Sequence, residues 1–369
     1  MNIRTTCAIC QHDKLNEFYK LDPMPVFMGT VPNEMEYKFQ DMTFVECLNC
    51  GEVQLGSYPS ISDLYLKNHN VDVVGQLWNS HFDSFSDFIG SVENKRVLEI
   101  SDPSAKLAKR CDKFKKWTII EMNPFFEATD NIDVIKDYFS YDLPIDIDVD
   151  VIVHSHFFEH SLNPSRDLKK MWEILPESGD MFFSIPDIPS LIQHSNSPTA
   201  LNFEHTYYYD LELLSFLLET NGFEVVEIRS FKNHSIFVHA KKSLRPARVS
   251  IIGYRDRKEM FVDCFGFHRN NVNLINTTLE KCDNTFIYGA HVTSQFYIFN
   301  GLNVKLMGTL DKSASNNGEI LYGTELRTFY PEELLNHEEA NVIVSHSSVY
   351  KNEIIENIKS FAGNRVKFF

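Results

Sequence analysis

Four of the seven cysteines occur as two Cys-x-x-Cys pairs, and this spacing constrains how the N-terminal part of the chain can fold. The pairs are Cys7/Cys10 and Cys47/Cys50. Two such pairs can bring four thiolates together in a closed tetrahedral site of the kind that holds structural zinc. Four sulfur ligands leave no open position for a substrate, so the pattern predicts a zinc ion that stabilises the fold without taking part in catalysis.

The cysteine count and the hydropathy pattern also bear on the compartment. Seven cysteines are an odd number, and their paired spacing fits a reduced chain better than a disulfide framework. The N-terminal sequence MNIRTTCAIC lacks the apolar core of a signal peptide. No segment approaches the roughly 18 apolar residues that are needed to cross a bilayer. We therefore expect a cytoplasmic protein that has no membrane partner.

Composition places the chain among globular proteins of more than one domain. Of its 369 residues, 43% are hydrophobic and 23% are charged, which excludes a disordered or fibrous chain. The formal net charge of −16 argues against a duplex nucleic-acid partner, because binding phosphates requires clustered Lys and Arg. The chain has only 15 glycines, so glycine-rich phosphate or cofactor loops should be scarce.

Short apolar runs alternate with helical patterns through most of the chain, which predicts a mainly parallel sheet with helices on both faces. The basic, proline-containing segment 241–248 reads as a linker, and a second strand–helix series follows it. We expect an α/β protein with three parts, at 1–65, 66–245 and 246–369. The expected strands are Lys38–Val45, Glu52–Leu55, Arg96–Ile100, Trp117–Ile120, Val149–His154, Met181–Ile185, Glu224–Ser230, Ser235–Ala240, Thr285–Tyr288, Val304–Leu310 and Val342–Ser345, and the expected helical segments are Leu64–Ile89, Ala105–Cys111, Asn163–Leu175 and Leu211–Thr220.

The segment VLEI at 97–100 begins what looks like a nucleoside-binding βαβ unit. Glu121 ends the next expected strand, where an acidic residue commonly holds ribose hydroxyls. The turn after the first strand, Ser101–Ala105, contains no glycine, although close approach of the backbone to a ligand would favour one. An ordinary βαβ unit that binds no ligand is equally compatible with this segment.

A cluster of polar residues follows the third strand of this series, at the edge where parallel sheets bind ligands. It comprises His154, His156, Glu159 and His160. The spacing from His156 to His160 also matches the inverted zinc-peptidase motif H-x-x-E-H. That motif requires a helix, whereas these residues directly follow an apolar strand.

A second polar segment, Asn202–His205, lies between an expected strand and an expected helix. An imidazole can act as a general base near neutral pH, so His205 with Glu204 beside it is a candidate, and one of the following tyrosines (Tyr207, Tyr208 and Tyr209) could supply a phenol. A histidine that is merely hydrogen-bonded at a helix entrance is the alternative. We interpret His234 and His239 as packing residues and Asp146, Asp148 and Asp150 as a solvated strand face.

Taken in order, these segments resemble the sugar C-methyltransferase family that acts on nucleotide-linked deoxysugars. The resemblance covers nearly the whole chain and preserves the order of a four-cysteine zinc module, a class I S-adenosylmethionine domain with a Rossmann-like sheet, and a second Rossmann-like domain. The matching segments are the four cysteines, VLEI at 97–100, IIEMNP at 119–124, HFFEH at 156–160, LPESG at 175–179, NFEH at 202–205, FIYGA at 286–290, LDKS at 310–313, YGTEL at 322–326 and PEEL at 331–334.

The resemblance implies specific roles for several residues. Glu121 would hold the ribose of S-adenosylmethionine, with Glu99, Ser101 and Met122 as further cofactor-binding residues. His156 would line the substrate side, and His205 with Glu204 would form the proton-abstracting base. The implied reaction is methylation of a sugar carbon beside a keto group, with a nucleotide sugar as the small-molecule partner.

The chain also departs from the family pattern, and the departures leave other hypotheses open. The first cofactor loop reads SDPSA in place of a glycine-rich turn, Asn202 and Phe203 stand where the family has tyrosine and histidine, and Gly289 alone remains of the second glycine turn. We therefore assign no dinucleotide to the C-terminal domain. One alternative is a methyltransferase-derived protein that no longer uses the cofactor and binds or isomerises a nucleotide sugar through His205. A zinc peptidase using His156, Glu159 and His160 is the other.

Overall fold

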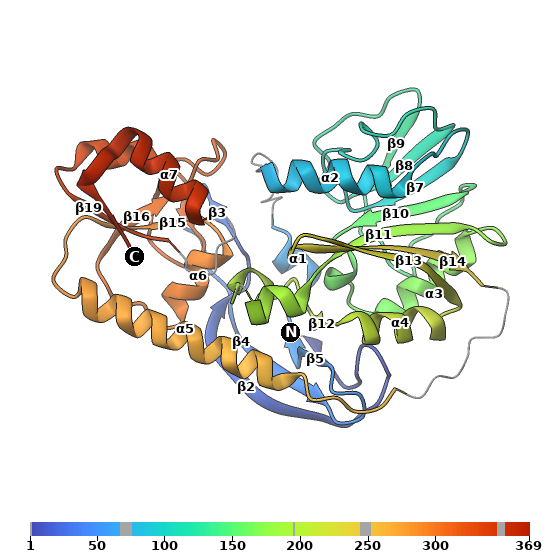
Figure 1. Cartoon of the computed structure of the whole chain (residues 1–369), viewed down its shortest axis with the longest axis horizontal. Helices are drawn as coiled ribbons and strands as arrows, with labels where there is room; N and C mark the ends of the chain where they lie inside the picture. The colour runs from blue at the N-terminus through green and yellow to red at the C-terminus, as the bar shows by residue number, and fades with distance from the viewer. Residues whose placement is uncertain (1, 67–75, 195, 244–251, 345–350) are drawn as a thin grey trace.

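The computed structural model describes residues 2–66, 76–194, 196–243, 252–344 and 351–369. Figure 1 shows two α/β regions side by side, with N-terminal strands and the long helix α5 (Lys258–Leu279) running beneath and between them. The expected α/β fold class is confirmed. The proposed division of the chain at residue 245 lies within 244–251, outside the described residues.

The larger region is built on a seven-stranded sheet. Its strand order is β13-β14-β11-β10-β7-β8-β9, and only β14 runs antiparallel to its neighbours. The strands are β7 (Arg96–Ile100), β8 (Lys116–Ile120), β9 (Ile132–Ile135), β10 (Val151–Ser155), β11 (Asp180–Pro186), β13 (Phe223–Phe231) and β14 (Ser235–Lys242).

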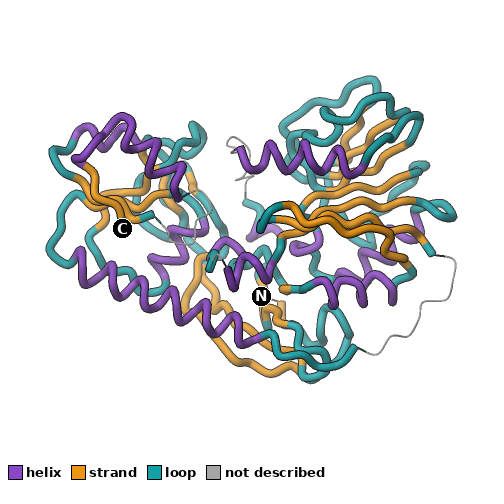
Figure 2. Tube along the Cα trace, viewed as in Figure 1, coloured by secondary structure: helices purple, strands orange, loops and turns teal. Residues whose placement is uncertain are grey.

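Helices cover both faces of this sheet, because alternate residues of its apolar strands point to opposite sides. In β10, Val151 and Val153 pack with α2 (Gln76–Ile89), whereas Ile152 packs with α3 (Pro164–Ile174) and α4 (Leu211–Thr220). Figure 2 shows these helices on either side of the strands. The chain leaves β7 toward β8 and β9 and later crosses to β10 on the other side, so a ligand crevice is expected where β7 and β10 end.

The smaller region contains a five-stranded, wholly parallel sheet in the order β18-β16-β15-β19-β20. Two helices, α6 (Val292–Phe299) and α7 (Lys351–Ala362), accompany it. The second strand–helix series expected from the sequence is therefore present. Its strands are β15 (Thr285–Tyr288), β16 (Leu306–Leu310), β18 (Thr328–Phe329), β19 (Ala340–Ile343) and β20 (Val366–Phe368).

The N-terminal segment pairs with both regions. Its antiparallel sheet consists of β2 (Leu15–Pro25), β4 (Phe39–Cys47), β5 (Val53–Leu55) and, from the larger region, β12 (Tyr207–Tyr208). The segment also forms two separate two-stranded antiparallel sheets. In one, β1 (Asn2–Ile3) pairs with β6 (Ser57–Tyr58), and in the other, β3 (Thr30–Val31) pairs with β17 (Ile320–Leu321) of the smaller region. Helix α5 packs on this sheet, with Phe265 stacked on Tyr19 at 3.9 Å between ring centroids.

Three expectations for local structure need correction. Ala105–Cys111 forms turns instead of a helix, because Ala105 has a left-handed backbone (φ +53°) that cannot begin a right-handed helix. The Asp146–Asp150 segment is a loop in which Asp148 and Asp150 pair with Arg96, and it is not a strand face. The expected helical run Leu64–Ile89 is divided between α1 (Ile61–Leu64) and α2, and residues 67–75 lie outside the described part.

Candidate active site

A cavity of about 450 Å³ lies at the carboxyl ends of β7, β8 and β10, where the strand order reverses. The N-terminal segment contributes Met28 and Tyr65 to its wall, and the smaller region contributes His291 and Val292. Among the described lining residues there is no Lys or Arg. The cavity is thus enclosed by all three parts of the chain.

The turn after β7 forms one wall of the cavity. Ser101 has φ +64° and Ala105 has φ +53°, so both adopt the left-handed conformation for which glycine is the default residue. The carboxylate of Asp102 fixes the turn by accepting hydrogen bonds from the backbone amides of Ser104 (2.9 Å), Lys106 and Leu107 (3.3 Å). The turn therefore has a glycine-like backbone although it lacks glycine.

The predicted cofactor-binding residues divide between cavity and core. Ser101, Glu121 and Met122 line the cavity, whereas Glu99 does not. The Glu99 carboxylate is buried and accepts a 2.7 Å hydrogen bond from the indole of Trp117. Burial raises the pKa of this carboxyl group well above its usual value. Glu99 is therefore placed to support the strand and not to contact a ligand in the cavity.

Glu121 follows the last residue of β8 and has its side chain at the cavity wall. Its backbone amide donates to Ile135 O, which holds the residue in line with the sheet, and its carboxylate accepts a 3.0 Å hydrogen bond from the amide of Asn123. Burial raises the pKa of Glu121. The position suits a carboxylate that accepts hydrogen bonds from hydroxyl groups of a nucleoside.

Glu159 lies at the centre of the polar cluster after β10. It belongs to the short 3₁₀ helix Phe158–His160, and its carboxylate lies 3.1 Å from His156 Nδ1 and 4.0 Å from His160 Nε2. Burial would raise the pKa of Glu159, but the surrounding imidazoles, His156 first, lower it below its usual value. His154 is not part of this site, because it is fully buried and stacks on Phe183.

His205 lies in a turn that Asn202 organises. The Asn202 side chain accepts hydrogen bonds from the amides of Glu204 (2.8 Å) and His205 (3.2 Å). His205 Nδ1 lies 3.0 Å from Ala200 O, and because a carbonyl can only accept, Nδ1 must carry the proton. Burial lowers the pKa of His205. The imidazole is consequently neutral near pH 7, with a lone pair on Nε2.

The side chain of Glu204 lies beside His160. Its carboxylate is 3.5 Å from His160 Nδ1, and the same nitrogen is 3.1 Å from the hydroxyl of Tyr65. Burial raises the pKa of Glu204 to about 8, so the group is largely protonated at neutral pH. The carbonyl of Ala200 orients the ring of His205.

Sequence reasoning assigned some aromatic and histidine residues to the wrong surroundings. Tyr207, Tyr208 and Tyr209 are buried and are absent from the cavity wall; the hydroxyl of Tyr207 donates to Phe158 O at 2.5 Å. Tyr65, which the sequence did not single out, supplies a phenol to the cavity instead. His234 also lines the cavity and is not a simple packing residue, whereas His239 stacks on Phe182 as expected.

The inverted zinc-peptidase motif is not formed. Its residues lie on a loop and a 3₁₀ helix, not on the α-helix that the motif requires. His156 groups with His81 and His234, whereas His160 groups with Glu159 and His205. Because the two motif histidines do not share a ligand group, the peptidase hypothesis is wrong.

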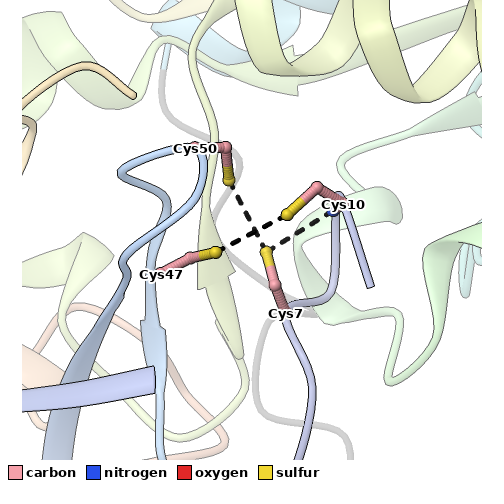
Figure 3. Close-up of side chains that lie close together, drawn as sticks. All are labelled: Cys7, Cys10, Cys47 and Cys50. Atoms are coloured by element: carbon pink, nitrogen blue, oxygen red, sulfur yellow. Dashed lines mark hydrogen bonds between the residues drawn. The ribbon is translucent and has the colours of Figure 1, made fainter. Parts of the chain in front are cut away.

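The four paired cysteines converge on one point, as Figure 3 shows, and none of them lines the cavity. Cys7 Sγ lies 3.7 Å from Cys50 Sγ, and Cys10 Sγ lies 3.5 Å from Cys47 Sγ. Four sulfurs at about 2.3 Å from a zinc ion would lie roughly 3.7–3.8 Å apart in a tetrahedron, so the donor set fits zinc. The amides of Ile9 and Cys10 point at Cys7 Sγ (3.4 and 3.5 Å), where they would stabilise a thiolate.

Comparison with known proteins identifies the middle of the chain. Residues 71–228 match the family model described as "Methyltransferase domain", which covers less than half of the chain. This stretch contains β7, β8, β9, β10 and β11 and most of β13, so the larger region carries a methyltransferase domain. None of the curated proteins matches the sequence.

Similar solved structures are methyltransferases. The N-methyltransferase NodS from Bradyrhizobium japonicum is 16% identical, with 45% of this chain and 94% of that chain covered and a TM-score of 0.32. A SAM-dependent methyltransferase from Aquifex aeolicus is 14% identical, with coverage of 44% and 89% and a TM-score of 0.35. In the described part of the chain, no helix is both long enough and apolar enough to cross a membrane.

Proposed function

We propose that this protein is an S-adenosylmethionine-dependent methyltransferase that methylates a carbon beside a keto group in a nucleotide-linked deoxysugar. One observation carries the proposal. A single cavity at the switch point of the methyltransferase domain combines Glu121, at the end of β8, with a neutral histidine, His205, on the turn before β12. The first suits a nucleoside, and the second suits the removal of a proton from carbon.

The cofactor side of the cavity fits the group that the domain implies. Glu121 would accept hydrogen bonds from the ribose hydroxyls, and the left-handed turn at Ser101 and Ala105 would let the backbone approach the methionine part. When bound, S-adenosylmethionine would supply an electrophilic methyl group. We further propose that Cys7, Cys10, Cys47 and Cys50 hold a structural zinc ion outside this cavity.

On the substrate side, His205 would act as the general base. Its Nδ1 proton is fixed by Ala200 O, so Nε2 is the atom that would accept a proton from the sugar carbon. Glu159, whose carboxylate lies within the same group of ligand-type atoms, would stabilise the imidazolium that forms. His156 would line the sugar, and the Tyr65 hydroxyl would hold the oxyanion that develops on the keto group.

The charge of the cavity limits how much of the substrate it would enclose. Its described lining contains no Lys or Arg that could bind a diphosphate. We therefore assign the sugar ring to the cavity and the nucleotide to the surface outside it. This assignment predicts that the sugar, more than the nucleotide, determines which substrates react.

Two reactions measured on the same protein test the proposal. Methyl transfer from labelled S-adenosylmethionine is measured over a panel of nucleotide-linked 4-keto deoxysugars, and deuterium uptake from solvent at the adjacent carbon is measured without cofactor. His205→Gln should lower both rates by about 10²–10⁴-fold. His194→Gln is the matched control, because His194 is exposed and does not line the cavity.

The outcomes separate the proposal from its nearest alternative. Methyl transfer that depends on His205 supports it. Deuterium uptake without methyl transfer would instead favour a protein that has lost the use of the cofactor and isomerises the sugar, a hypothesis motivated by the glycine-free turn at 101–105. Equal rates in His205→Gln and the wild type would contradict the role of His205.

A further inference from the structure

Three histidines from three separate elements meet at one end of the cavity. His81 lies on α2, His156 follows β10, and His234 lies in the turn between β13 and β14. Their ring centroids are 5.3 Å (His81 to His156), 5.7 Å (His81 to His234) and 5.7 Å (His156 to His234) apart. One nitrogen of each ring lies within 4.8 Å of one nitrogen of the other two.

The cluster leaves a buried polar atom without a partner. His81 is fully buried, and its Nδ1 has no hydrogen-bond partner among the described residues. A buried imidazole nitrogen without a partner loses its hydration without compensation. Ordinary packing would favour an apolar side chain at this position. A cation bound between the rings would supply the missing partner.

One nitrogen of each ring lies beside a hydroxyl group, and the other nitrogen of His156, Nδ1, lies 3.1 Å from the carboxylate of Glu159. His81 Nε2 lies 3.2 Å from both Ser155 Oγ and Ser184 Oγ. Ser235 Oγ lies 2.6 Å from His234 Nδ1 and 2.9 Å from His156 Nε2. Metal-ligating histidines almost always donate their second ring N–H to a carboxylate, a backbone carbonyl or a water molecule, which fixes the tautomer, and Glu159 offers such a carboxylate to His156.

The backbone of His156 adopts a left-handed conformation at the place where the three histidine side chains meet. His156 has φ +53°, a left-handed conformation that is unfavourable for a residue with a side chain. Its amide donates a 2.8 Å hydrogen bond to Ser184 O, which holds the strained turn in place. Strain of this kind is concentrated at ligand-binding sites.

We propose that His81, His156 and His234 bind a transition-metal ion of the zinc class, with the remaining coordination position facing the cavity. Three imidazoles with one open position form the ligand set of catalytic zinc, unlike the closed set of four thiolates. His156, His234 and the neighbouring Trp78 line the cavity, so a fourth ligand could reach the ion from there. The proposal depends on the cluster alone and not on the proposed methyl transfer.

Cobalt titration of the full-length protein tests the site. Protein whose thiolate site is already filled with zinc is titrated with Co²⁺ in the absence of cofactor and substrate, and the visible ligand-field absorption is recorded. We expect one additional Co²⁺ to bind without the intense thiolate charge-transfer absorption that cobalt at the cysteines would give. His234→Gln and His81→Gln should weaken this binding by about 100-fold or more.

His239→Gln is the matched control, because His239 lies on β14 but stacks on Phe182 and pairs with Asp180. It should bind Co²⁺ like the wild type. Since buried His81 could be needed for folding, an anomalous difference map of wild-type crystals soaked in Co²⁺ provides a test without substitution. It should show a peak at roughly 2.1 Å from a nitrogen of each of the three rings.

Several results would overturn the proposal. They are the absence of extra Co²⁺, binding at the cysteines alone, equal affinity in His234→Gln and the wild type, or no anomalous peak between the rings. The three histidines would then form an aromatic packing cluster with Trp78. Because the titration contains neither cofactor nor sugar, its result does not depend on whether the protein transfers methyl groups.

Discussion

Ser101 and Ala105 keep the left-handed backbone of a glycine turn without being glycine. This conformation could not be read from the sequence, since serine and alanine seldom adopt it. This turn lacks the glycine that close approach of the backbone to a ligand would favour. In the structure, the strain is compensated by Asp102, which bonds to three amides of the turn. The loop therefore has a glycine-like backbone at the expense of local strain.

Substitution of Ser101 measures this strain. Ser101→Val should lower the free energy of unfolding by about 1–2 kcal/mol, because a β-branched residue fits the left-handed region poorly. Ser101→Gly should leave it unchanged or raise it by up to about 1 kcal/mol. Denaturant unfolding of the three proteins makes the comparison. Equal stabilities for the glycine and valine variants would show that Ser101 is not strained.

His268 gives a prediction for pH. It is buried on α5 against Phe296 and Tyr297, and burial lowers its pKa to about 4. The unfolded chain, with a histidine pKa near 6.5, then binds the proton more tightly than the folded chain, so acidification favours unfolding. The stability associated with neutral His268 is present above about pH 6.5 and is lost as the pH falls toward 4.

His268→Leu removes this titration. Between pH 7 and pH 5, its free energy of unfolding should fall by roughly 1–2 kcal/mol less than that of the wild type. Urea unfolding at both pH values, monitored by circular dichroism, gives the two differences. The other buried histidines titrate in both proteins and cancel in the comparison. Identical pH dependence in the two proteins would contradict the assignment.

At the scale of elements, apolar runs in the sequence predicted several strands and helices, whereas elements that depend on long-range pairing could not be predicted. Arg96–Ile100, Thr285–Tyr288 and Leu211–Thr220 were predicted with the bounds that the structure shows. Helix α5 was missed although its buried residues recur at helical spacing, because asparagines and a glycine interrupt the pattern. The two-residue strand β12 exists only through its pairing with β5, and local sequence carries no signal for such a strand.

Part of the site was predictable because some of its residues lie directly next to predicted strands and helices. His156, His205 and Glu121 follow strands or precede a helix, so their positions could be inferred from the alternation of elements. Tyr65 and His81 come from segments before the sheet begins, and only the folded chain brings them to the cavity region. Burial also affects two of the predicted residues. It raises the pKa of Glu204 to about 8, and it places the carboxylate of Glu99 in the core, where it does not line the cavity.

The second cysteine knuckle depends on a glycine for its approach to another segment. Gly51 has φ +75°, and a Cβ atom there would lie 1.7 Å from Arg255 O. Gly51→Ala should therefore lower the free energy of unfolding by roughly 3 kcal/mol or more and reduce the zinc content. Gly90→Ala is the matched control, with φ +69° and no atom within 4 Å, and should cost about 1–2 kcal/mol. Thermal unfolding and metal analysis measure both, and equal losses would contradict the close approach.

At the scale of the whole molecule, Arg257 joins three parts of the chain. Its buried guanidinium donates to Asp210 (2.8 Å) and Glu212 (2.8 Å) of the larger region and to Cys50 O (2.8 Å) of the second cysteine knuckle, and it immediately precedes α5. Such a connection keeps the N-terminal sheet, the methyltransferase domain and α5 in one arrangement. The cavity, whose wall includes residues of the N-terminal segment, of the methyltransferase domain and of the smaller region that follows α5, depends on this arrangement.

Removing this guanidinium should be costly. Arg257→Gln leaves Asp210 and a buried carbonyl without their donor, so the free energy of unfolding should fall by about 3–5 kcal/mol. Arg255→Gln is the matched control, because Arg255 is 67% exposed and lies 3.6–3.9 Å from the same two acidic residues. It should change stability by less than about 1 kcal/mol. Denaturant unfolding compares them, and similar losses would refute the role of Arg257.

The central claim is that the cavity at the switch point binds the methyl donor of a methyltransferase. Calorimetric titration of S-adenosylhomocysteine into the full-length protein tests it most directly. Wild-type protein and the control Glu127→Gln, at an exposed residue of the same loop, should bind one equivalent with micromolar affinity, and Glu121→Gln should bind at least tenfold more weakly. Absence of binding to the folded wild-type protein would contradict the account.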